Sequence, residues 1–156
     1  MKLSKNLSLG EFTRSQTAKR RGIDNTPKGE HLEAARILAE DIFQPIREHF
    51  GKPIFISSGY RSQALNEAIG GSRTSQHSKG EAIDIDMDHR NGPENEEVFH
   101  YIRENLPFDQ LIWEFGTDER PDWVHVSYKK GGPQRGQILA AKRNSKGKTY
   151  YENWKA

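Results

Sequence analysis

The first half of the chain carries hydrophobic residues at helical spacing, separated by capping and turn residues. Ser8 followed by Glu11 forms a capping box, which predicts a helix over residues 8–21. A second helix is predicted over residues 26–51, with a kink at Pro45. The hydrophobic stripe of this second helix consists of Leu32, Ala35, Leu38, Ile42 and Ile46.

The second half of the chain carries shorter hydrophobic segments, several of which alternate with a period of two. Such alternation is typical of strands whose two faces meet different surroundings. The predicted strands are residues 54–57, 82–86, 110–113 and 123–128. Further helices are predicted over residues 63–69 and after Pro93. Helices in the N-terminal part of the chain, followed by short strands, predict an α+β fold. We expect one domain whose N-terminal helices pack on a small, mostly antiparallel sheet.

Length and composition narrow the chemistry. A chain of 156 residues fits one domain with a core of its own. It has no cysteine, which excludes a disulfide framework, a thiolate zinc site and a cysteine nucleophile. No hydrophobic run approaches the roughly 18 residues that span a bilayer. The N-terminal segment MKLSKNLSLGEF lacks the hydrophobic core of a signal peptide, so we expect synthesis in the cytoplasm.

The net charge of +2 conceals a basic C-terminal region. Residues 129–156 hold eight lysines and arginines against one acid, Glu152. Such a region on an acidic body predicts attraction to an anionic polymer, for example one of a cell wall. A solvated, partly mobile tail is the alternative interpretation.

An aspartate and a histidine occupy strand positions between hydrophobic neighbours. In residues 82–86 (AIDID) and 123–128 (WVHVSY), Asp84 and His125 lie on one face, while isoleucine and valine lie on the other. If the strands are neighbours, both side chains project toward a common point, and His77 lies just before the first strand. Each residue alone has an ordinary structural interpretation, as a core histidine or a turn aspartate. Together they form the ligand set of a catalytic zinc site with an open fourth position.

Three segments of the sequence resemble one known family. SSGYRS (57–62), LNEAIGGSRTSQHSKGEAIDID (65–86) and WVHVSY (123–128) are similar to the zinc D-Ala-D-Ala carboxypeptidase family, peptidase family M15. The resemblance is greatest to its phage-type peptidoglycan peptidases. It implies a hedgehog/DD-peptidase-like fold, a zinc peptidase domain over residues 1–130, and one zinc ion per chain. Residues 131–156 would then be a basic extension of the same domain.

The resemblance also implies roles for single residues. The implied zinc ligands are His77, Asp84 and His125. The family carries an acidic catalytic residue three positions before the last ligand, which is Asp122 here; Glu114 is the main alternative among the nearby acids. Arg61 corresponds to an arginine that faces the substrate's carboxylate, and Ser75 to a serine that contacts the substrate near the metal. Ion pairing and capping are the structural alternatives for these two residues.

The predicted function is therefore zinc-dependent hydrolysis of an amide bond in the peptide part of bacterial peptidoglycan, by a carboxypeptidase or an endolysin-like endopeptidase. A catalytically silent metal- and wall-binding module on the same fold is the alternative, and the presence of Asp122 argues against it. Nucleic-acid binding by the C-terminal region has only charge and a few aromatic residues to support it. We expect a monomer that reaches the wall after release from the cell or as part of a phage particle.

Overall fold

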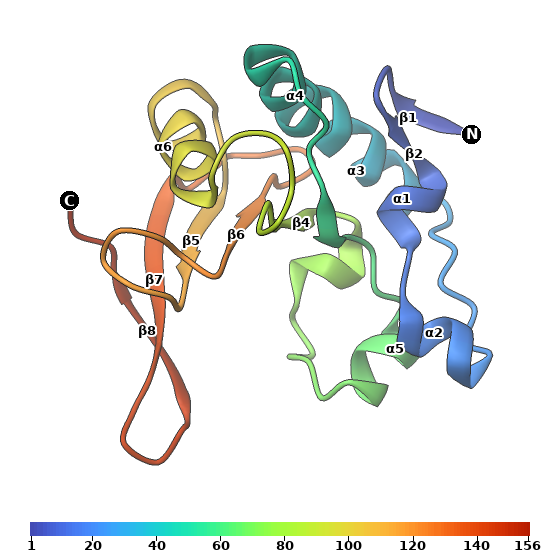
Figure 1. Ribbon diagram of the computed structural model, residues 1–156. Helices are drawn as coiled ribbons and strands as arrows, with labels where there is room; N and C mark the ends of the chain where they lie inside the picture. The colour runs from blue at the N-terminus through green and yellow to red at the C-terminus, as the bar shows by residue number, and fades with distance from the viewer.

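A mixed sheet of six strands lies at the centre of the computed structural model, which describes residues 1–156 (Figure 1). Its strands are β3 (Ile56–Ser58), β4 (Ala82–Ile85), β5 (Gln110–Glu114), β6 (Trp123–Ser127), β7 (Gln137–Arg143) and β8 (Thr149–Asn153). Their order across the sheet is β3-β4-β6-β5-β7-β8, and all neighbours are antiparallel except β5 and β7. Strands β1 (Lys2–Ser4) and β2 (Leu7–Ser8) form a separate pair. The predicted α+β fold with a mostly antiparallel sheet is confirmed.

The helices are short. They are α1 (Leu9–Thr13), α2 (Gln16–Arg21), α3 (Glu30–Leu38), the π-helix η1 (Ala39–Phe43), α4 (Gln44–Phe50), α5 (Gln63–Ala68), the 3₁₀ helix η2 (Gln76–Lys79) and α6 (Asn95–Asn105). The capping box is present, with the Glu11 N–H donating to Ser8 Oγ at 3.1 Å. The single helix predicted over residues 8–21 is wrong, because the chain turns extended at Arg14 and Ser15 and Ser15 then caps α2.

The second predicted helix begins later than expected and changes type at its kink. It starts at Glu30, after Gly29 adopts a positive φ of 54°. Pro45 has no N–H to donate, so an ordinary helix loses a hydrogen bond there. The preceding turn, η1, is wider, and the Gln44 N–H reaches back to the carbonyl of Ala39. The helix therefore continues past Pro45 through a π turn, which is a recognised cause of helix bending.

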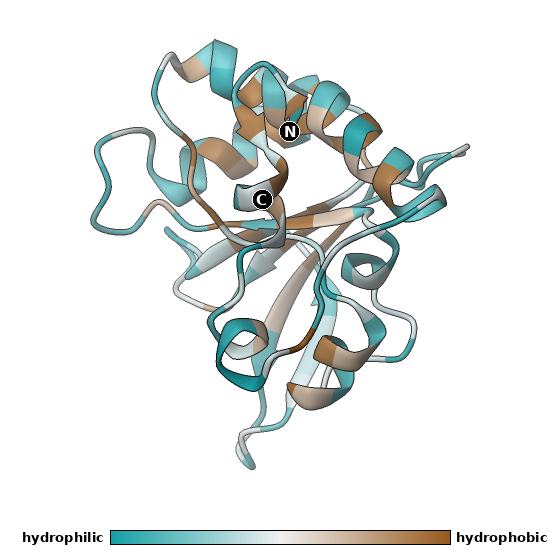
Figure 2. Cartoon of the chain, turned by 90° about the vertical axis from the view of Figure 1, so that its right-hand side faces the viewer, coloured by the Kyte–Doolittle hydropathy of each residue, from teal (hydrophilic) through white to brown (hydrophobic).

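The two faces of the sheet meet different surroundings. Ile83 and Ile85 of β4 and Val124 and Val126 of β6 are fully buried on one face, where α3, η1, α4 and α6 cover them. Figure 2 shows the hydrophobic residues gathered on these helices and along the strands, while the loops are hydrophilic. The alternate residues of the same strands point to the opposite face, which is polar near its centre. The fold thus leaves one face of the sheet available for a site.

The C-terminal region is part of the sheet. The sequence predicted no strand in residues 131–156, and the structure corrects this: β7 pairs with β5, and β8 pairs with β7 (Figure 1). The physical reason is packing on the core side, where Ala140 is buried and the ring centroid of Trp154 lies 5.1 Å from that of Phe99. Four of the eight basic residues of this region, Lys142, Arg143, Lys146 and Lys148, therefore stand on a hairpin rather than on a free tail.

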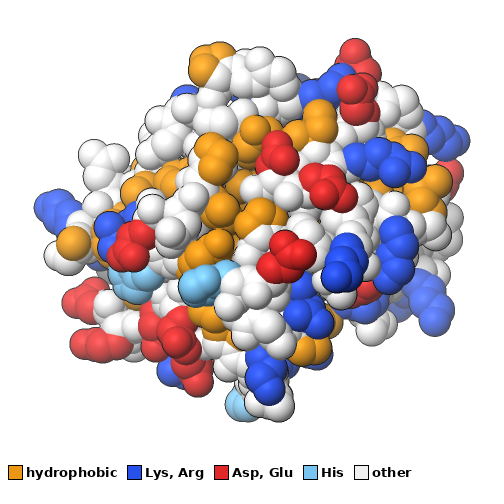
Figure 3. Space-filling view, turned by 90° about the horizontal axis from the view of Figure 1, so that it is seen from above, with side chains coloured by type: hydrophobic (Ala, Val, Ile, Leu, Met, Phe, Trp, Pro, Cys, Tyr) orange, Lys and Arg blue, Asp and Glu red, His pale blue; other side chains and the backbone are white.

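The surface on the helical side mixes charged, polar and hydrophobic side chains. Figure 3, a view onto the helical side, shows acidic and basic side chains interspersed, with small hydrophobic areas between them. None of the helices has the length and hydrophobicity that crossing a membrane requires.

Candidate metal centre

Three elements bring the predicted ligands together. His77 lies on η2, Asp84 on β4 and His125 on β6, and one potential ligand atom of each lies within 4.8 Å of those of the other two. Asp84 and His125 are directly opposite each other in the antiparallel pair β4–β6. The period of two along each strand places both side chains on the polar face, as the sequence predicted.

The segment before β4 is shaped to deliver His77. Ser75 begins η2 by accepting a hydrogen bond from the His77 N–H at 3.2 Å. Gly80 ends η2 with a positive φ of 74°. A Cβ atom at Gly80 would overlap the carbonyl oxygen of His31 in α3, so both the backbone conformation and the close approach require glycine. The helix α3 therefore fixes how closely η2 packs, and with it the position of His77.

Hydrogen bonds orient the ligand side chains. His77 Nδ1 lies 2.7 Å from the carbonyl oxygen of Gly59, so this nitrogen carries the proton and donates it. His77 Nε2 is then left with its lone pair facing Asp84 Oδ1 at 3.3 Å. His125 Nδ1 lies 3.0 Å from the same oxygen. The Gly59 carbonyl thus fixes the tautomer of a ligand histidine, a role that such outer hydrogen bonds commonly have in metal sites.

The protonation states of His77 and Asp84 favour the binding of a cation. Burial lowers the pKa of His77, and the nearby carboxylate opposes this only in part. Burial by itself raises the pKa of Asp84, but His77 and His125 hold it well below its usual range. His77 is therefore neutral and Asp84 ionised at neutral pH, the forms in which both bind a metal.

The donor set and its surroundings fit zinc. Two imidazole nitrogens and one carboxylate oxygen, without a thiolate, leave one position of a tetrahedral ion open. The side chain of His77 is only 3% exposed, whereas those of Asp84 and His125 are 15% and 12% exposed. Their exposed side borders a cleft with a volume of about 1020 Å³. The open position of an ion held here would face this cleft.

A buried acid stands beside the ligands. Glu114 of β5 lines the same cleft and is only 7% exposed. It pairs with Trp123 across β5–β6, while Ile112 pairs with His125, so Glu114 and His125 are diagonal neighbours on one face. Diagonal neighbours in a sheet lie about 7–8 Å apart, within reach of long side chains. Burial raises the pKa of Glu114 to about 7; the Asp84 charge adds to this, and His125 and Arg143 oppose it.

Asp122 has a different setting. It precedes β6 and is exposed, and it borders a second cavity that also contacts Trp154 and Lys155. Its backbone is tied in place, since its N–H donates to the Glu114 carbonyl at 2.9 Å and its carbonyl accepts from Asn95 Nδ2 at 3.0 Å. The residues lining the cleft of the metal cluster include Glu114 but not Asp122.

Arg61 and Ser75 both border the cleft. The Arg61 N–H donates to the His77 carbonyl at 3.1 Å, which ties this residue to the ligand helix. Its Nε is buried without a hydrogen-bond partner, so the guanidinium has unused donors. Ser75 caps η2, which is the structural role considered for it, and the same residue also reaches the cleft.

Other polar residues near the motif have structural roles. Asp86 Oδ1 accepts from the N–H of Asp88 at 3.0 Å and from Asn95 Nδ2 at 3.3 Å, so it supports the loop after β4 rather than a ligand histidine. His89 is exposed in that loop. Sequence reasoning missed the role of Gly59, whose carbonyl orients His77. The glycine in SSGYRS was the available signal in the sequence. In the structure its neighbour Tyr60 packs in the core.

A histidine–aspartate–histidine cluster that borders an open cleft, with a buried carboxylate beside it, is an arrangement typical of metal-dependent hydrolases. A comparison with protein families agrees with this. The family model described as Peptidase M15 matches residues 5–127, and the chain belongs to this family. A comparison with curated proteins finds no match. The family is one of peptidases, so the family match indicates a peptidase.

Proposed function

We propose that this protein is a zinc-dependent peptidase that hydrolyses an amide bond in the peptide part of bacterial peptidoglycan, with one zinc ion per chain. The observation that carries the proposal is the cluster of His77, Asp84 and His125 at an open cleft in a chain of the peptidase M15 family. When bound, zinc supplies a Lewis acid and lowers the pKa of water from 15.7 to about 7. The enzyme meets the wall peptide after the enzyme has been released from the cell or from a phage particle.

Glu114 is the general acid–base in this proposal. As a carboxylate, it accepts the proton of the attacking water, and it then donates that proton to the nitrogen of the leaving amine. Such help is typically worth about 10²–10⁴-fold in rate, and it is most effective when the pKa lies near the working pH. The raised pKa of Glu114, about 7, satisfies this condition.

The choice between the two acids follows from their positions. Glu114 is buried in the cleft wall as a diagonal neighbour of a ligand, whereas Asp122 is exposed at another cavity. The motif spacing favours Asp122 and the geometry favours Glu114. We propose Glu114, and the substitution of each acid by its amide separates the two assignments.

Arg61 is proposed to hold a carboxylate of the wall peptide. A guanidinium is planar and binds a carboxylate with two parallel hydrogen bonds. Its unpartnered Nε and its place at the cleft support this role. Ser75 lies at the same side of the cleft and offers a hydroxyl to the substrate backbone.

The test combines metal analysis with digestion of purified peptidoglycan. We expect about one zinc per chain, release of new amine groups, and loss of that release on chelation. Glu114→Gln should lower the rate by about 10²–10⁴-fold with zinc content unchanged, while Asp122→Asn keeps most of the activity. The opposite outcome for the two variants assigns the role to Asp122. Zinc binding and wall binding without released amines would instead support a silent module.

Mass spectrometry of a defined muropeptide digest identifies the bond. A carboxypeptidase removes one terminal residue, whereas an endopeptidase separates the stem peptide or a cross-link. The two classes therefore give fragments of different mass from one substrate.

A further inference from the structure

The β7–β8 hairpin forms one wall of the metal cleft. Leu139 and Arg143 of β7 and Thr149 and Tyr151 of β8 line the cleft together with the ligands. The family match ends at residue 127, so this wall lies outside the matched region. Features of the cleft that depend on the hairpin are therefore properties of this chain, separate from the shared metal-binding motif.

The sheet register places the hairpin next to the reacting groups. Glu114 pairs with Ala141 on β7, and Ala141 pairs with Tyr151 on β8. By this register all three residues lie on the cleft face of the sheet, with the small side chain of Ala141 between Glu114 and Tyr151. Tyr151 is 55% exposed; its partial burial, and then the charges of Glu114 and Asp84, raise its pKa above the ordinary value. Its hydroxyl is therefore a neutral donor at neutral pH, as an ordinary tyrosine is.

Arg143 lies at the rim of this wall and forms no direct ion pair, although its charge acts on the nearby Glu114. The lysines and arginines form six ion pairs with carboxylates, and Arg143 takes part in none of them. Its guanidinium carbon lies 3.8 Å from the ring centroid of Phe115, which leaves the edge of the guanidinium and its N–H groups for other contacts. Phe115 has a positive φ of 55°, a conformation that is costly for a bulky residue and is often found at functional sites.

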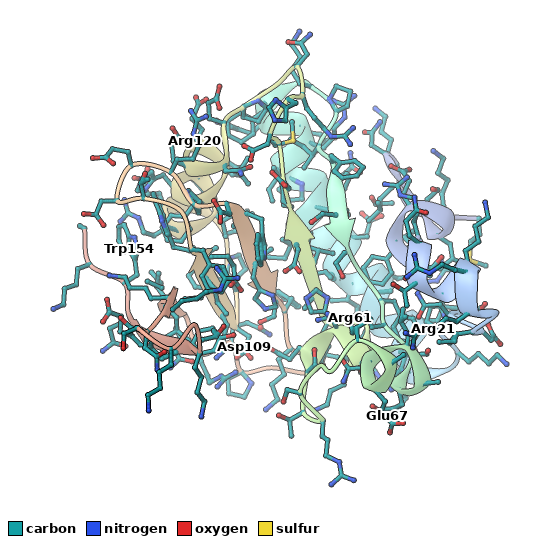
Figure 4. The ribbon with its side chains drawn as sticks, turned by 60° about the horizontal axis from the view of Figure 1, so that its bottom comes forward. Arg21, Arg61, Glu67, Asp109, Arg120 and Trp154 are labelled. Atoms are coloured by element: carbon teal, nitrogen blue, oxygen red, sulfur yellow. The ribbon has the colours of Figure 1, made fainter.

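Arg61 and Arg143 stand on opposite sides of the metal ligands. Arg61 follows β3, and the sheet order then runs through the ligand strands β4 and β6 to β5 and β7. Figure 4 shows Arg61 on one side of these strands and the C-terminal segment with Trp154 on the other. Four strand spacings are about 19 Å. An extended peptide of about five to six residues covers this distance.

We infer that the hairpin selects the substrate, and that Arg143 and Tyr151 bind an acidic group of the wall peptide on the side of the metal opposite Arg61. The inference rests on the proposed function and adds a substrate class to it: peptides of several residues with two acidic groups, one on each side of the scissile bond. A neutral amide in place of the second carboxylate removes the charge that Arg143 would bind.

The test uses zinc-loaded protein and a matched pair of stem pentapeptides, one with a free α-carboxylate on its D-Glu residue and one with that carboxylate amidated. The wild type should show a kcat/KM about 10–100-fold higher for the acidic peptide, the range expected for hydrogen bonds to a charged group. Arg143→Gln should remove this preference, because it should lower kcat/KM for the acidic peptide and leave kcat/KM for the amidated peptide unchanged. Tyr151→Phe should lower kcat/KM for the acidic peptide by a smaller factor. Arg143→Lys should restore part of the preference.

Lys142→Gln is the matched control. Lys142 is the preceding residue of β7 and pairs with Glu152 at 2.7 Å, and it borders the second cavity rather than the metal cleft. The control should keep the wild-type preference. An Arg143→Gln variant that hydrolyses both peptides as the wild type does, or loses activity on both equally, overturns the inference.

A binding measurement separates this inference from the proposed function. If the wild type hydrolyses neither peptide, the proposed function fails, and calorimetry with the same two peptides then decides the role of the hairpin. Tighter binding of the acidic peptide that is lost in Arg143→Gln supports the inference. Equal binding of both peptides by the wild type, or a preference that survives the substitution, rejects it.

Discussion

Replacing Gly59 by alanine should disturb both the fold and the metal centre. An added Cβ would overlap the carbonyl oxygen of Phe12, which accepts a hydrogen bond from the Tyr60 N–H at 2.8 Å. Relief of this overlap moves the loop that carries the Gly59 carbonyl, and that carbonyl holds His77 Nδ1 at 2.7 Å. Overpacking typically costs 1–3 kcal/mol and each weakened hydrogen bond about 1 kcal/mol, so we expect a loss of about 2–4 kcal/mol.

Two measurements check this expectation. Thermal unfolding of metal-free protein should show a Tm lower by about 5–15 °C for a domain of this size. A competition assay should show zinc affinity lower by about 10–100-fold, as is typical when a ligand histidine loses the group that orients it.

The matched control is the same substitution at Gly10 in α1. A Cβ at Gly10 meets nothing closer than Ser8 Oγ at 3.8 Å, so Gly10→Ala should raise stability by about 0.5–1 kcal/mol through helix propensity alone. The reasoning is refuted if Gly59→Ala unfolds like the wild type, or if it loses stability while its zinc affinity stays unchanged.

Three further predictions concern other parts of the molecule. The pKa of Glu114 rises from 4.5 to about 7 on folding, so metal-free wild type should lose up to about 3 kcal/mol of stability between pH 4.5 and 7 that Glu114→Gln retains, as denaturant titrations at several pH values would show. Trp154→Ala should lower stability by about 1–3 kcal/mol in the same titrations, because Trp154 stacks near Trp113 with ring centroids 6.3 Å apart. Replacing Lys146 and Lys148 by glutamine should weaken sedimentation with anionic walls at low salt but not at high salt, since the Debye length is about 10 Å at 0.1 M; equal loss at both salts contradicts an electrostatic role.

Strand alternation predicted that the side chains of the candidate metal ligands Asp84 and His125 come together, because it fixes the face on which a side chain lies. In AIDID and WVHVS, the same residues that needed burial determined the direction of Asp84 and His125. The capping box at Ser8 was predicted for a similar reason, since it depends on residues three apart. These successes all rest on local periodicity.

The failures depend on contacts distant in sequence. Strand β7 lies parallel to β5 and is stabilised by packing that includes Trp154, which no short pattern of residues reveals. The assignment of the catalytic acid to Asp122 is not among these failures, and our preference for Glu114 is a proposal that also depends on contacts distant in sequence. Spacing along the chain relates Asp122 to His125, but the β5–β6 register determines that Glu114 faces the cleft.

The alternation of core-facing and cleft-facing residues also separates the candidate metal ligands from the hairpin that we propose selects the substrate. Each of β4, β5 and β6 buries every second residue under the helices, so a ligand on these strands cannot move without moving the core. Strand β8, by contrast, has a neighbour on one side only, and all of its residues are exposed. Substitutions there cost little stability, because exposed positions away from caps and networks usually change it by less than about 0.5 kcal/mol. If the hairpin selects the substrate, as we infer, the side chains of this wall can change, and the preferred peptide with them, while the candidate metal ligands remain in place.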